Sequence, residues 1–320
     1  MVRRLLLFVV LLVVLSGSTV ATGQEEQLEW NRFDWQRFEV AGCPAFVVLP
    51  PAKERQSPLP WVFYAPTFDQ LLPNERDEGW MIARFLDAGM AIAGIDVGES
   101  YGSPDGVAAF DALYEHLVAS EWNFDTKASL LARSRGGLML YNWASENPDR
   151  VACIAGIYPV CDLESYPGLE KASAAYGMTP AELAGSLDAF NPIARLQPLA
   201  KAKIPIFHIH GDVDEVVPSD ANTQVVSDRY GQLGGNMSHT VALGQGHNMW
   251  PGFFQCEQLV DFVIEHGHPQ EWSDRTKSRS SRRYAMGLAG GLFGLAFGIF
   301  AVKRLRRISN GGEAATESER

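Results

Sequence analysis

A short run in the middle of the sequence combines the residue types that a nucleophilic serine requires. Ser134 follows the apolar run 130–132, and small residues stand two positions before and two positions after it, at Ala132 and Gly136. A sharp strand-to-helix turn needs such small neighbours, because the chain passes close to the serine on both sides. The turn would expose the Ser134 hydroxyl and aim the amide of Arg135 at a developing oxyanion. The run therefore predicts nucleophilic attack on a carbonyl carbon.

Two later segments could supply the base and the acid that serine chemistry needs. Asp212 and Asp214 come just after the strand predicted at 204–210, and His247 lies in a glycine-containing loop after the strand predicted at 240–243. In such chemistry a histidine takes the serine proton, and an aspartate orients the histidine. Because each residue follows a predicted strand, all of them would meet at one edge of a parallel sheet.

Short apolar runs alternate with longer mixed segments in the body of the chain, residues 24–271. Strands are predicted at 45–49, 61–65, 90–96, 129–133, 151–158, 204–210 and 240–243, and helices at 77–88, 105–119, 136–146, 220–233 and 253–266. Several strands are apolar almost throughout, as in sheets that are covered on both faces. The alternation predicts an α/β fold, with a mostly parallel central sheet and helices on both faces.

One interval breaks this alternation. About forty residues, 161–203, separate two predicted strands, and they contain helix-like pieces at 169–176 and 180–189. An interval of this length is too long for a simple connection. We therefore expect a small helical lid insertion over the carboxyl edge of the sheet.

Both ends of the chain carry segments typical of export and membrane insertion. Residues 1–21 contain two arginines, eleven consecutive apolar residues and then small residues, which predicts a cleavable secretory signal, or alternatively an uncleaved anchor. Residues 284–302 carry no charge and have basic residues on both sides, which predicts a transmembrane helix. A basic linker at 272–283 and a cytoplasmic basic and polar tail at 303–320 would flank this helix. The catalytic body 24–271 would then lie on the extracytoplasmic side.

Glycines recur at every fourth position of the predicted transmembrane helix. Gly290, Gly294 and Gly298 form one such series, and Gly287 and Gly291 repeat its spacing. Small residues on one face let two helices approach closely, which indicates self-association in the membrane. The alternative is that glycine is simply frequent in membrane helices.

The charge balance excludes one large class of partners. The segment 24–274 carries fifteen basic and thirty-five acidic side chains, within a chain of net charge −11. A body this acidic repels phosphate backbones, so we expect no nucleic-acid binding. His208 and His210 share one face of a strand, but no third ligand follows at a suitable spacing, so we interpret them as core histidines. Neither a metal nor a cofactor is expected.

The segments ARSRGG, HGDVDEVVP and GQGHNMW resemble those of α/β-hydrolases over about residues 40–268. They are most similar to the branch that contains prolyl-oligopeptidase-like and dienelactone-hydrolase-like enzymes. The resemblance implies that Ser134 is the nucleophile, that Asp214, which precedes a Val-Pro pair, is the acid, and that His247 is the general base. It also implies that the backbone amide of Arg135 forms part of the oxyanion hole.

Other loops complete the site by the same resemblance. The second oxyanion amide would come from Thr67 or Phe68, in the loop after an early strand. The run that contains Glu99 and Tyr101 resembles a loop that lines the family's pocket, with ordinary turn residues as the alternative. Trp250, three residues after the predicted base, is either a wall of the acyl pocket or an aromatic residue of the core.

Cysteines and arginines near the predicted site leave alternatives open. Cys161 and Cys256 both lie near the catalytic edge and could form a disulfide in an oxidising compartment, whereas Cys153 lies inside a strand and should be a free thiol. Arg133 and Arg135 flank the serine, where they either meet an anionic substrate group or form ion pairs within the acidic body.

Together these observations predict an exported, membrane-anchored serine hydrolase that cleaves carboxylic esters through a Ser-His-Asp triad and an acyl-enzyme. The Ser-Arg pair at 134–135 resembles that of esterases acting on glucuronic-acid esters, which makes carbohydrate esters a candidate substrate class. The alternatives are a prolyl-oligopeptidase-like serine peptidase that acts on small peptides, and a non-catalytic ectodomain with the same fold.

Overall fold

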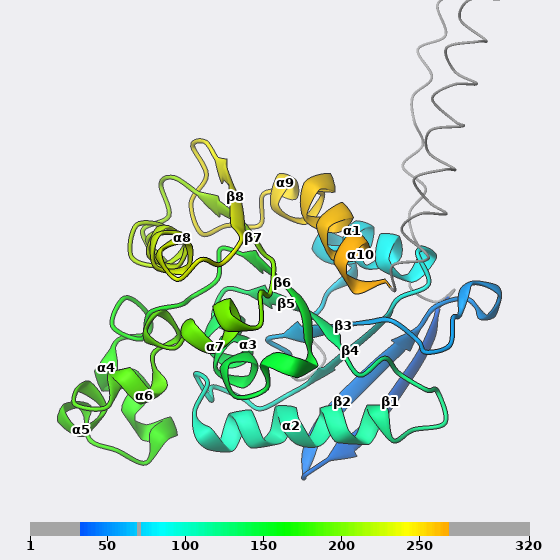
Figure 1. Cartoon of the computed structure of the whole chain (residues 1–320), viewed down its shortest axis with the longest axis horizontal. Helices are drawn as coiled ribbons and strands as arrows, with labels where there is room; N and C mark the ends of the chain where they lie inside the picture. The colour runs from blue at the N-terminus through cyan, green and yellow to red at the C-terminus, as the bar shows by residue number, and fades with distance from the viewer. Residues whose placement is uncertain (1–32, 69–71, 269–320) are drawn as a thin grey trace, which may run out of the picture.

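The computed structural model describes residues 33–68 and 72–268, and a sheet of eight strands runs through its centre (Figure 1). The strands are β1 (Asp34–Val40), β2 (Cys43–Leu49), β3 (Trp61–Ala65), β4 (Ala91–Ile95), β5 (Ala128–Arg133), β6 (Val151–Ile157), β7 (Ile206–Gly211) and β8 (Met237–Ala242). Their order is β1-β2-β4-β3-β5-β6-β7-β8; β1 and β2 pair antiparallel, and the strands from β4 to β8 pair parallel. The predicted α/β class with a mostly parallel sheet is confirmed.

Strand β1 has no counterpart among the strands predicted from the sequence. It forms a hairpin with β2 through Ala41 and Gly42, whose φ angles of 52° and 76° suit a two-residue hairpin turn. Most of its residues are exposed, because it lies at the edge of the sheet. An edge strand needs no continuous apolar run, so the pattern that identified the other strands is missing here.

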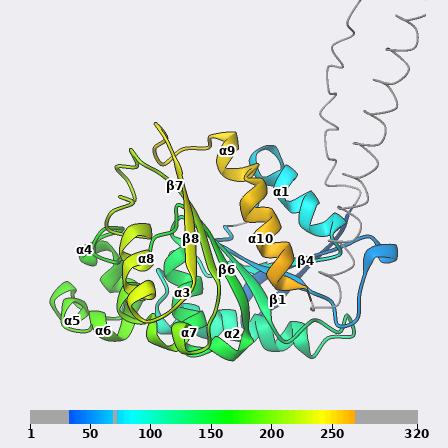
Figure 2. The same cartoon turned by 45° about the horizontal axis from the view of Figure 1, so that its top comes forward.

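Helices cover both faces of the sheet, as the sequence predicted (Figures 1 and 2). One face carries α1 (Glu75–Asp87), α9 (Pro251–Phe254) and α10 (Glu257–Gly267), and the other carries α2 (Pro104–Val118), α3 (Gly136–Glu146), α7 (Gln197–Lys201) and α8 (Thr223–Gln232). Successive strand residues point to opposite faces, so Phe63 packs against Phe110 and Trp143 on one side while Tyr64 belongs to the cluster on the other. Each helical layer therefore closes its own apolar core against the sheet.

The interval 161–203 is helical, as predicted; its first part packs at the carboxyl edge of the sheet, and its last helix, α7, covers one face. Besides α7 it contains the helices α4 (Leu169–Ala172), α5 (Pro180–Ala184) and α6 (Leu187–Phe190) and the 3₁₀ turns η4 (Ser173–Tyr176) and η5 (Pro192–Ala194). Two further 3₁₀ turns, η2 (Ala52–Glu54) and η3 (Pro148–Arg150), lie outside it. The side-chain oxygen of Asn222 fixes its start by accepting hydrogen bonds from the amides of Cys161 and Asp162, at 2.7 and 3.1 Å. Leu163 and Leu183 bury the insertion against Val217.

Small residues make room for the turn between β5 and α3. Ala65, Ala132 and Gly156 occupy one row across three neighbouring strands. A Cβ atom on Gly136 would overlap the carbonyl oxygen of Ala65, and one on Gly137 would overlap the carbonyl oxygen of Val160. Both overlaps are with backbone, which cannot move aside as a flexible side chain would.

We predict that Gly137→Ala lowers the free energy of unfolding by about 1–3 kcal/mol, because its methyl group forces the start of α3 away from β6. The matched control is Gly231→Ala in α8, where nothing lies within 4 Å of the added atom and helix propensity favours alanine. Urea unfolding of the three proteins checks this. Equal stabilities for the two variants would show that the backbone contact at residue 137 is not tight.

Several predicted features fall outside the described residues. The secretory signal (1–21), the basic linker (272–283), the transmembrane helix (284–302) and the tail (303–320) all do so, as do residues 24–32 and 269–271 of the predicted body. Within 33–68 and 72–268, no helix has the length and apolar character needed to cross a membrane.

The disulfide considered between Cys161 and Cys256 is not present. All four cysteines are free thiols, and Cys153 is buried as predicted. Cys161 belongs to the apolar cluster on one face of the sheet, whereas Cys256 packs against the cluster on the other face. The sequence placed both near one edge but could not show that the sheet separates them.

Candidate active site

Ser134 occupies a strained turn directly after β5. Its φ angle of +50° is left-handed, a conformation that is costly for a serine and that persists only when its surroundings enforce it. Here the Ser134 amide donates to the carbonyl of Ile157 at 3.0 Å, and its carbonyl accepts from the amides of Gly137 and Val160 at 2.9 and 2.8 Å. Hydrogen bonds to β6 and to α3 thus hold the turn on both sides.

The structure brings Ser134, His247 and Asp214 together from three separate loops. The Ser134 Oγ lies 2.9 Å from His247 Nε2, and His247 Nδ1 lies 2.8 Å from Asp214 Oδ2. Because an ionised carboxylate can only accept, His247 Nδ1 carries the proton and Nε2 accepts from the Ser134 hydroxyl. This is the arrangement in which an imidazole can take the serine proton.

The loop after β7 keeps Asp214 charged. Burial raises the pKa of Asp214, but hydrogen bonds from His210, from His247 and from the Val217 amide outweigh it and hold that pKa well below the ordinary value. The amides of Val216 and Val217 donate to Oδ1 at 3.0 and 2.9 Å. Oδ2 is thereby left for the histidine.

The choice between Asp212 and Asp214 is resolved by their contacts. Asp212 Oδ1 accepts a hydrogen bond from the Gly244 amide at 2.6 Å, which ties the loop after β7 to the loop after β8. Asp212 therefore has a turn-stabilising role, and it is Asp214 that contacts His247.

A cavity of about 460 Å³ opens beside Ser134 and His247. Its lining residues are Pro66, Phe68, Leu72, Glu99, Arg133, Ser134, Arg135, Tyr158, His247, Asn248 and Met249. They come from loops after four different strands and from the strand end that carries the serine. The cavity is therefore large enough for a small substrate and has the reactive hydroxyl in its wall.

Residues 104–262 match the family model described as the prolyl oligopeptidase family. With the fold and the Ser-His-Asp geometry, this match decides the class. The protein is a serine hydrolase of the α/β-hydrolase fold, similar to the prolyl oligopeptidase family over residues 104–262.

Solved structures show how widely this fold is shared. Dipeptidyl peptidase 4 from Porphyromonas gingivalis is 14% identical to the hydrolase, with a TM-score of 0.58 over 73% of this chain and 35% of that one. A puromycin hydrolase is 19% identical, with a TM-score of 0.55 over 72% and 39%. An S-formylglutathione hydrolase from Agrobacterium tumefaciens is 14% identical, with a TM-score of 0.58 over 74% and 95%. The hydrolase thus spans little more than a third of dipeptidyl peptidase 4 and of the puromycin hydrolase. No curated protein matches it.

The predicted oxyanion and pocket residues are only partly found at the cavity. Phe68 and Glu99 line it, whereas Thr67 lines a separate pocket of about 60 Å³. Tyr101 is buried against the insertion, where its carbonyl accepts a hydrogen bond from Tyr176 at 2.8 Å, and it does not line the cavity. The prediction that Tyr101 faces the substrate pocket is therefore wrong for this cavity.

Trp250 and the insertion also differ from expectation. Trp250 is 40% exposed and packs edge-on against Phe253, so it is neither a wall of the cavity nor a core residue. No residue of 161–203 lines the cavity, although the ring of Tyr166 lies 5.8 Å from the Arg135 guanidinium at its rim. The insertion thus reaches the edge of the site and does not cover it as the predicted lid would.

Both arginines beside the serine form ion pairs with acidic residues of the body. Arg135 pairs with Glu99 and lies over the ring of Phe68. Arg133 pairs with Glu78, whose side chain is fully buried. This outcome agrees with the alternative that the two arginines form ion pairs within the acidic body. The sequence did not indicate that Glu78 would be the partner of Arg133.

Sequence reasoning missed two more residues at the cavity, Tyr158 and Met249. The Tyr158 ring centroid lies 4.4 Å from that of His247, and its hydroxyl contacts the sulfur of Met249. Burial raises the pKa of Tyr158 to about 12, so it is an uncharged phenol at neutral pH. The position of Tyr158 directly after β6, like that of Ser134 after β5, was the sequence feature that could have identified it as a site residue.

His208 and His210 are core histidines, as interpreted from the sequence. Both ring nitrogens of each are hydrogen-bonded: His208 to Tyr141 at 2.8 Å and Thr223 at 3.0 Å, and His210 to Thr223 at 2.7 Å and the Val217 carbonyl at 2.8 Å. No group of potential metal ligands occurs among the residues that the structure describes. Oδ2 of Asp214 lies 3.5 Å from His210, so the hydrogen bonds from Tyr141 through Thr223 to His210 lead to the catalytic edge of the sheet.

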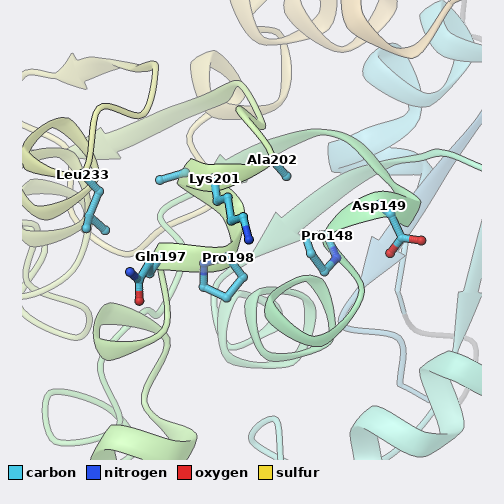
Figure 3. Close-up of a pocket in the computed structure, with 8 residues that line it drawn as sticks. Pro148, Asp149, Gln197, Pro198, Lys201, Ala202 and Leu233 are labelled. Atoms are coloured by element: carbon cyan, nitrogen blue, oxygen red, sulfur yellow. The ribbon is translucent and has the colours of Figure 1, made fainter.

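A larger hollow of about 830 Å³ lies at the opposite edge of the sheet (Figure 3). It is lined by residues just before β6, β7 and β8, including Pro148, Lys201 and Leu233. None of its lining residues is a serine, cysteine or histidine. The smaller cavity at Ser134 therefore carries the chemistry.

The buried His208 makes stability dependent on pH. Burial, and then the charges of His210 and His239, lower its pKa well below the ordinary value. The native state therefore binds fewer protons than the unfolded chain, and stability is complete above about pH 6.5 and declines as the pH falls. We predict a loss of about 1.4 kcal/mol per pH unit from this group, measured by urea unfolding between pH 7.5 and 5.

His208→Gln should remove that contribution and give a shallower slope than the wild type. Other titrating groups, such as His268 with a pKa lowered by burial to about 4, remain in both proteins and cancel in the comparison. Identical slopes for the two proteins would mean that His208 is already charged in the folded state.

Proposed function

We propose that the hydrolase cleaves carboxylic esters through an acyl-enzyme. The observation that carries this proposal is the hydrogen-bonding distance of 2.9 Å between Ser134 Oγ and His247 Nε2, in a chain that continues to Asp214. In the mechanism His247 takes the Ser134 proton while Oγ attacks the carbonyl carbon. His247 then protonates the leaving alcohol, and water repeats the sequence to release the acid. Asp214 remains ionised throughout and fixes the histidine tautomer.

Backbone amides would stabilise the tetrahedral oxyanion. The amide of Arg135, directly after the serine at the start of α3, is the first candidate. Phe68 is favoured over Thr67 as the second, because Phe68 lines the cavity and Thr67 lines another pocket. Each such donor typically contributes about 3 kcal/mol to lowering the barrier.

An ester substrate is favoured over a peptide by the extent of the structural likeness. The likeness covers 95% of the S-formylglutathione hydrolase, but only 35% and 39% of dipeptidyl peptidase 4 and the puromycin hydrolase. A peptidase is the second candidate, supported by the match to the prolyl oligopeptidase family. Carbohydrate esters are the ester class to test first, given the Ser-Arg pair at 134–135.

We predict that a fluorophosphonate probe labels the wild type and does not label Ser134→Ala. The probe requires an activated serine, and the variant removes only the hydroxyl oxygen. Gel fluorescence or mass spectrometry of the adduct measures the result. Ser219→Ala, in a turn outside the cavity, is the control and should label like the wild type. Equal labelling of Ser134→Ala and wild type would refute the proposed nucleophile.

A substrate panel separates the two enzyme candidates. We expect p-nitrophenyl acetate, p-nitrophenyl butyrate and an acetylated sugar to be hydrolysed, and a prolyl p-nitroanilide to be cleaved at least tenfold more slowly in kcat/KM. The anilide nitrogen must be protonated by His247 before it can leave, whereas p-nitrophenolate leaves without a proton. A faster anilide than ester reaction would favour the peptidase.

Export and membrane anchoring form a further part of the proposal. Asp34 pairs with Leu49, and β2 runs antiparallel to β4, so the first described strand starts at the amino edge of the parallel strands. His268 lies beside Gln56, and Gly267 lies against Ser129 at the start of β5, so α10 ends at that same edge. Both ends of the described part therefore lie at the edge of the sheet opposite Ser134.

We expect the full chain to stay in the membrane pellet after alkaline carbonate extraction. Leu292→Arg should release it, because a charge at the centre of the apolar stretch 284–302 costs about 3 kcal/mol of insertion energy. Ser309→Arg, beyond that stretch, is the control. Quantitative release of the unaltered chain would contradict the anchor.

A further inference from the structure

The ring of Tyr158 packs against the imidazole of His247. The two ring centroids lie 4.4 Å apart, with an angle of 55° between the ring planes. The imidazole has hydrogen-bond partners at both nitrogens, Ser134 at Nε2 and Asp214 at Nδ1. These bonds direct the two nitrogens but leave the ring able to tilt about the line between them, because the last torsion of a histidine side chain is soft. The Tyr158 ring lies close enough to block such a tilt on one side.

The Tyr158 ring is itself held firmly in place. Tyr158 is 1% exposed, and its ring meets Phe253 edge-on at 4.9 Å and Phe254 edge-on at 6.3 Å. Its φ angle of +37° is left-handed, a conformation that persists only when the surroundings enforce it. The Tyr158 amide donates to the carbonyl of Ile209 at 2.8 Å, which ties the residue to β7. Tyr158 is therefore a fixed wall, whereas His247 lies on a glycine-containing loop.

The hydroxyl of Tyr158 makes contacts of its own at the far end of the ring. It lies 3.9 Å from the sulfur of Met249, two residues after His247, and Arg133 is another of its hydrogen-bond partners. These contacts orient the hydroxyl end of the side chain. It is the ring, however, that lies against the imidazole. Any restraint on His247 should therefore depend on the ring more than on the hydroxyl.

We propose that Tyr158 is a positioning residue, whose ring holds the imidazole of His247 in the orientation in which Nε2 accepts the Ser134 proton. A general base must meet its proton within hydrogen-bonding distance, and a misplacement of about 1 Å can slow a reaction by roughly 100-fold. The same orientation is needed when His247 activates water, so Tyr158 acts in both halves of the reaction. This inference rests on the serine–histidine chemistry of the proposed function and not on its ester specificity.

The test removes the ring and compares kcat with KM. For full-length wild type and Tyr158→Leu, we measure hydrolysis of p-nitrophenyl butyrate and the rate constant of fluorophosphonate labelling. We expect kcat and the labelling rate constant to fall by roughly 10- to 100-fold with little change in KM, because His247 serves both acylation and deacylation. A higher KM with unchanged kcat would show that Tyr158 is only a wall of the substrate pocket, which overturns the proposal.

A conservative variant separates the ring from the hydroxyl. Tyr158→Phe keeps the ring and should retain most of the wild-type kcat. An equal loss in Tyr158→Phe and Tyr158→Leu would assign the effect to the hydroxyl and overturn the inference. Tyr158→Met is a second variant without the ring, for the case in which Tyr158→Leu does not fold, because methionine fills irregular space without a rigid flat face. It should show the same loss as Tyr158→Leu.

A matched control tests whether the loss of any buried tyrosine has the same effect. Tyr230 is fully buried in α8, in the apolar cluster on the other face of the sheet from Tyr158. Tyr230→Leu removes a ring of the same size and should keep the wild-type kcat. Circular dichroism confirms that each variant is folded at the assay temperature. A loss in Tyr230→Leu as large as that in Tyr158→Leu would overturn the specific role of Tyr158.

Failure of this inference is distinguishable from failure of the proposed function. If the wild type neither reacts with the fluorophosphonate nor hydrolyses the ester, the proposed function is wrong. If the wild type is labelled but does not hydrolyse the ester, the labelling rate constants alone decide on Tyr158. If the wild type does both and the folded variants without the ring keep its kcat, the positioning role is overturned while the enzyme stands.

Discussion

The whole site depends on keeping one carboxylate, that of Asp214, ionised at the end of a buried strand. Removing a carboxylate from water costs several kcal/mol unless donors replace the lost hydration. The loop after β7 supplies them, because two consecutive amides, those of Val216 and Val217, converge on Oδ1. Oδ2 then has His247 as its nearest partner. The orientation of the imidazole thus follows from the backbone of a four-residue loop.

A series of hydrogen bonds between buried side chains leads from Tyr141 to His210, which lies beside the same carboxylate. The Val217 carbonyl can only accept, so His210 Nε2 donates to it, and His210 Nδ1 lies 2.7 Å from the Thr223 hydroxyl oxygen. Thr223 in turn accepts from His208 Nδ1, and His208 Nε2 accepts from Tyr141. Every donor has an acceptor, which is the condition for a polar network in a core. The chain therefore points an N–H group toward the edge where Asp214 lies.

Strand ends were the most informative feature of the sequence. Ser134, His247 and the pair Asp212 and Asp214 could be selected before the structure was known, because parallel topology brings the carboxyl ends of strands to one edge whatever the packing details. The choice of Asp214 over Asp212 came from the family resemblance. Tyr101 and Trp250 also follow strands, but the direction of their side chains depends on local backbone. Tyr101 has a φ of +48°, and Trp250 precedes the short α9 and turns outward over Gly252. Position along the chain does not determine such orientations.

Residues that act through tertiary packing were beyond sequence reasoning. Glu78 is one of several acids in α1, and only its place on the apolar side of that helix, with Met81, Ile82 and Phe85, hints that it is buried. Its partner Arg133 is far away along the chain, and nothing in the spacing links the two. β1 was missed because its exposed edge position relaxes the apolar pattern. Each catalytic residue follows a strand, which the sequence pattern can indicate, whereas the residues that balance the nearby charges follow no such pattern.

That charge balance has a consequence for turnover. In the proposed ester hydrolysis a carboxylate would form beside Ser134, and an uncompensated arginine at about 4 Å would attract it by about 4 kcal/mol at an effective dielectric constant of 20. Such attraction corresponds to roughly a thousandfold slower release of the acid. Arg133 is balanced by Glu78, and Arg135 by Glu99, on the two sides of the cavity. Each cation beside Ser134 thus has its own carboxylate, which lowers its attraction for a newly formed acid.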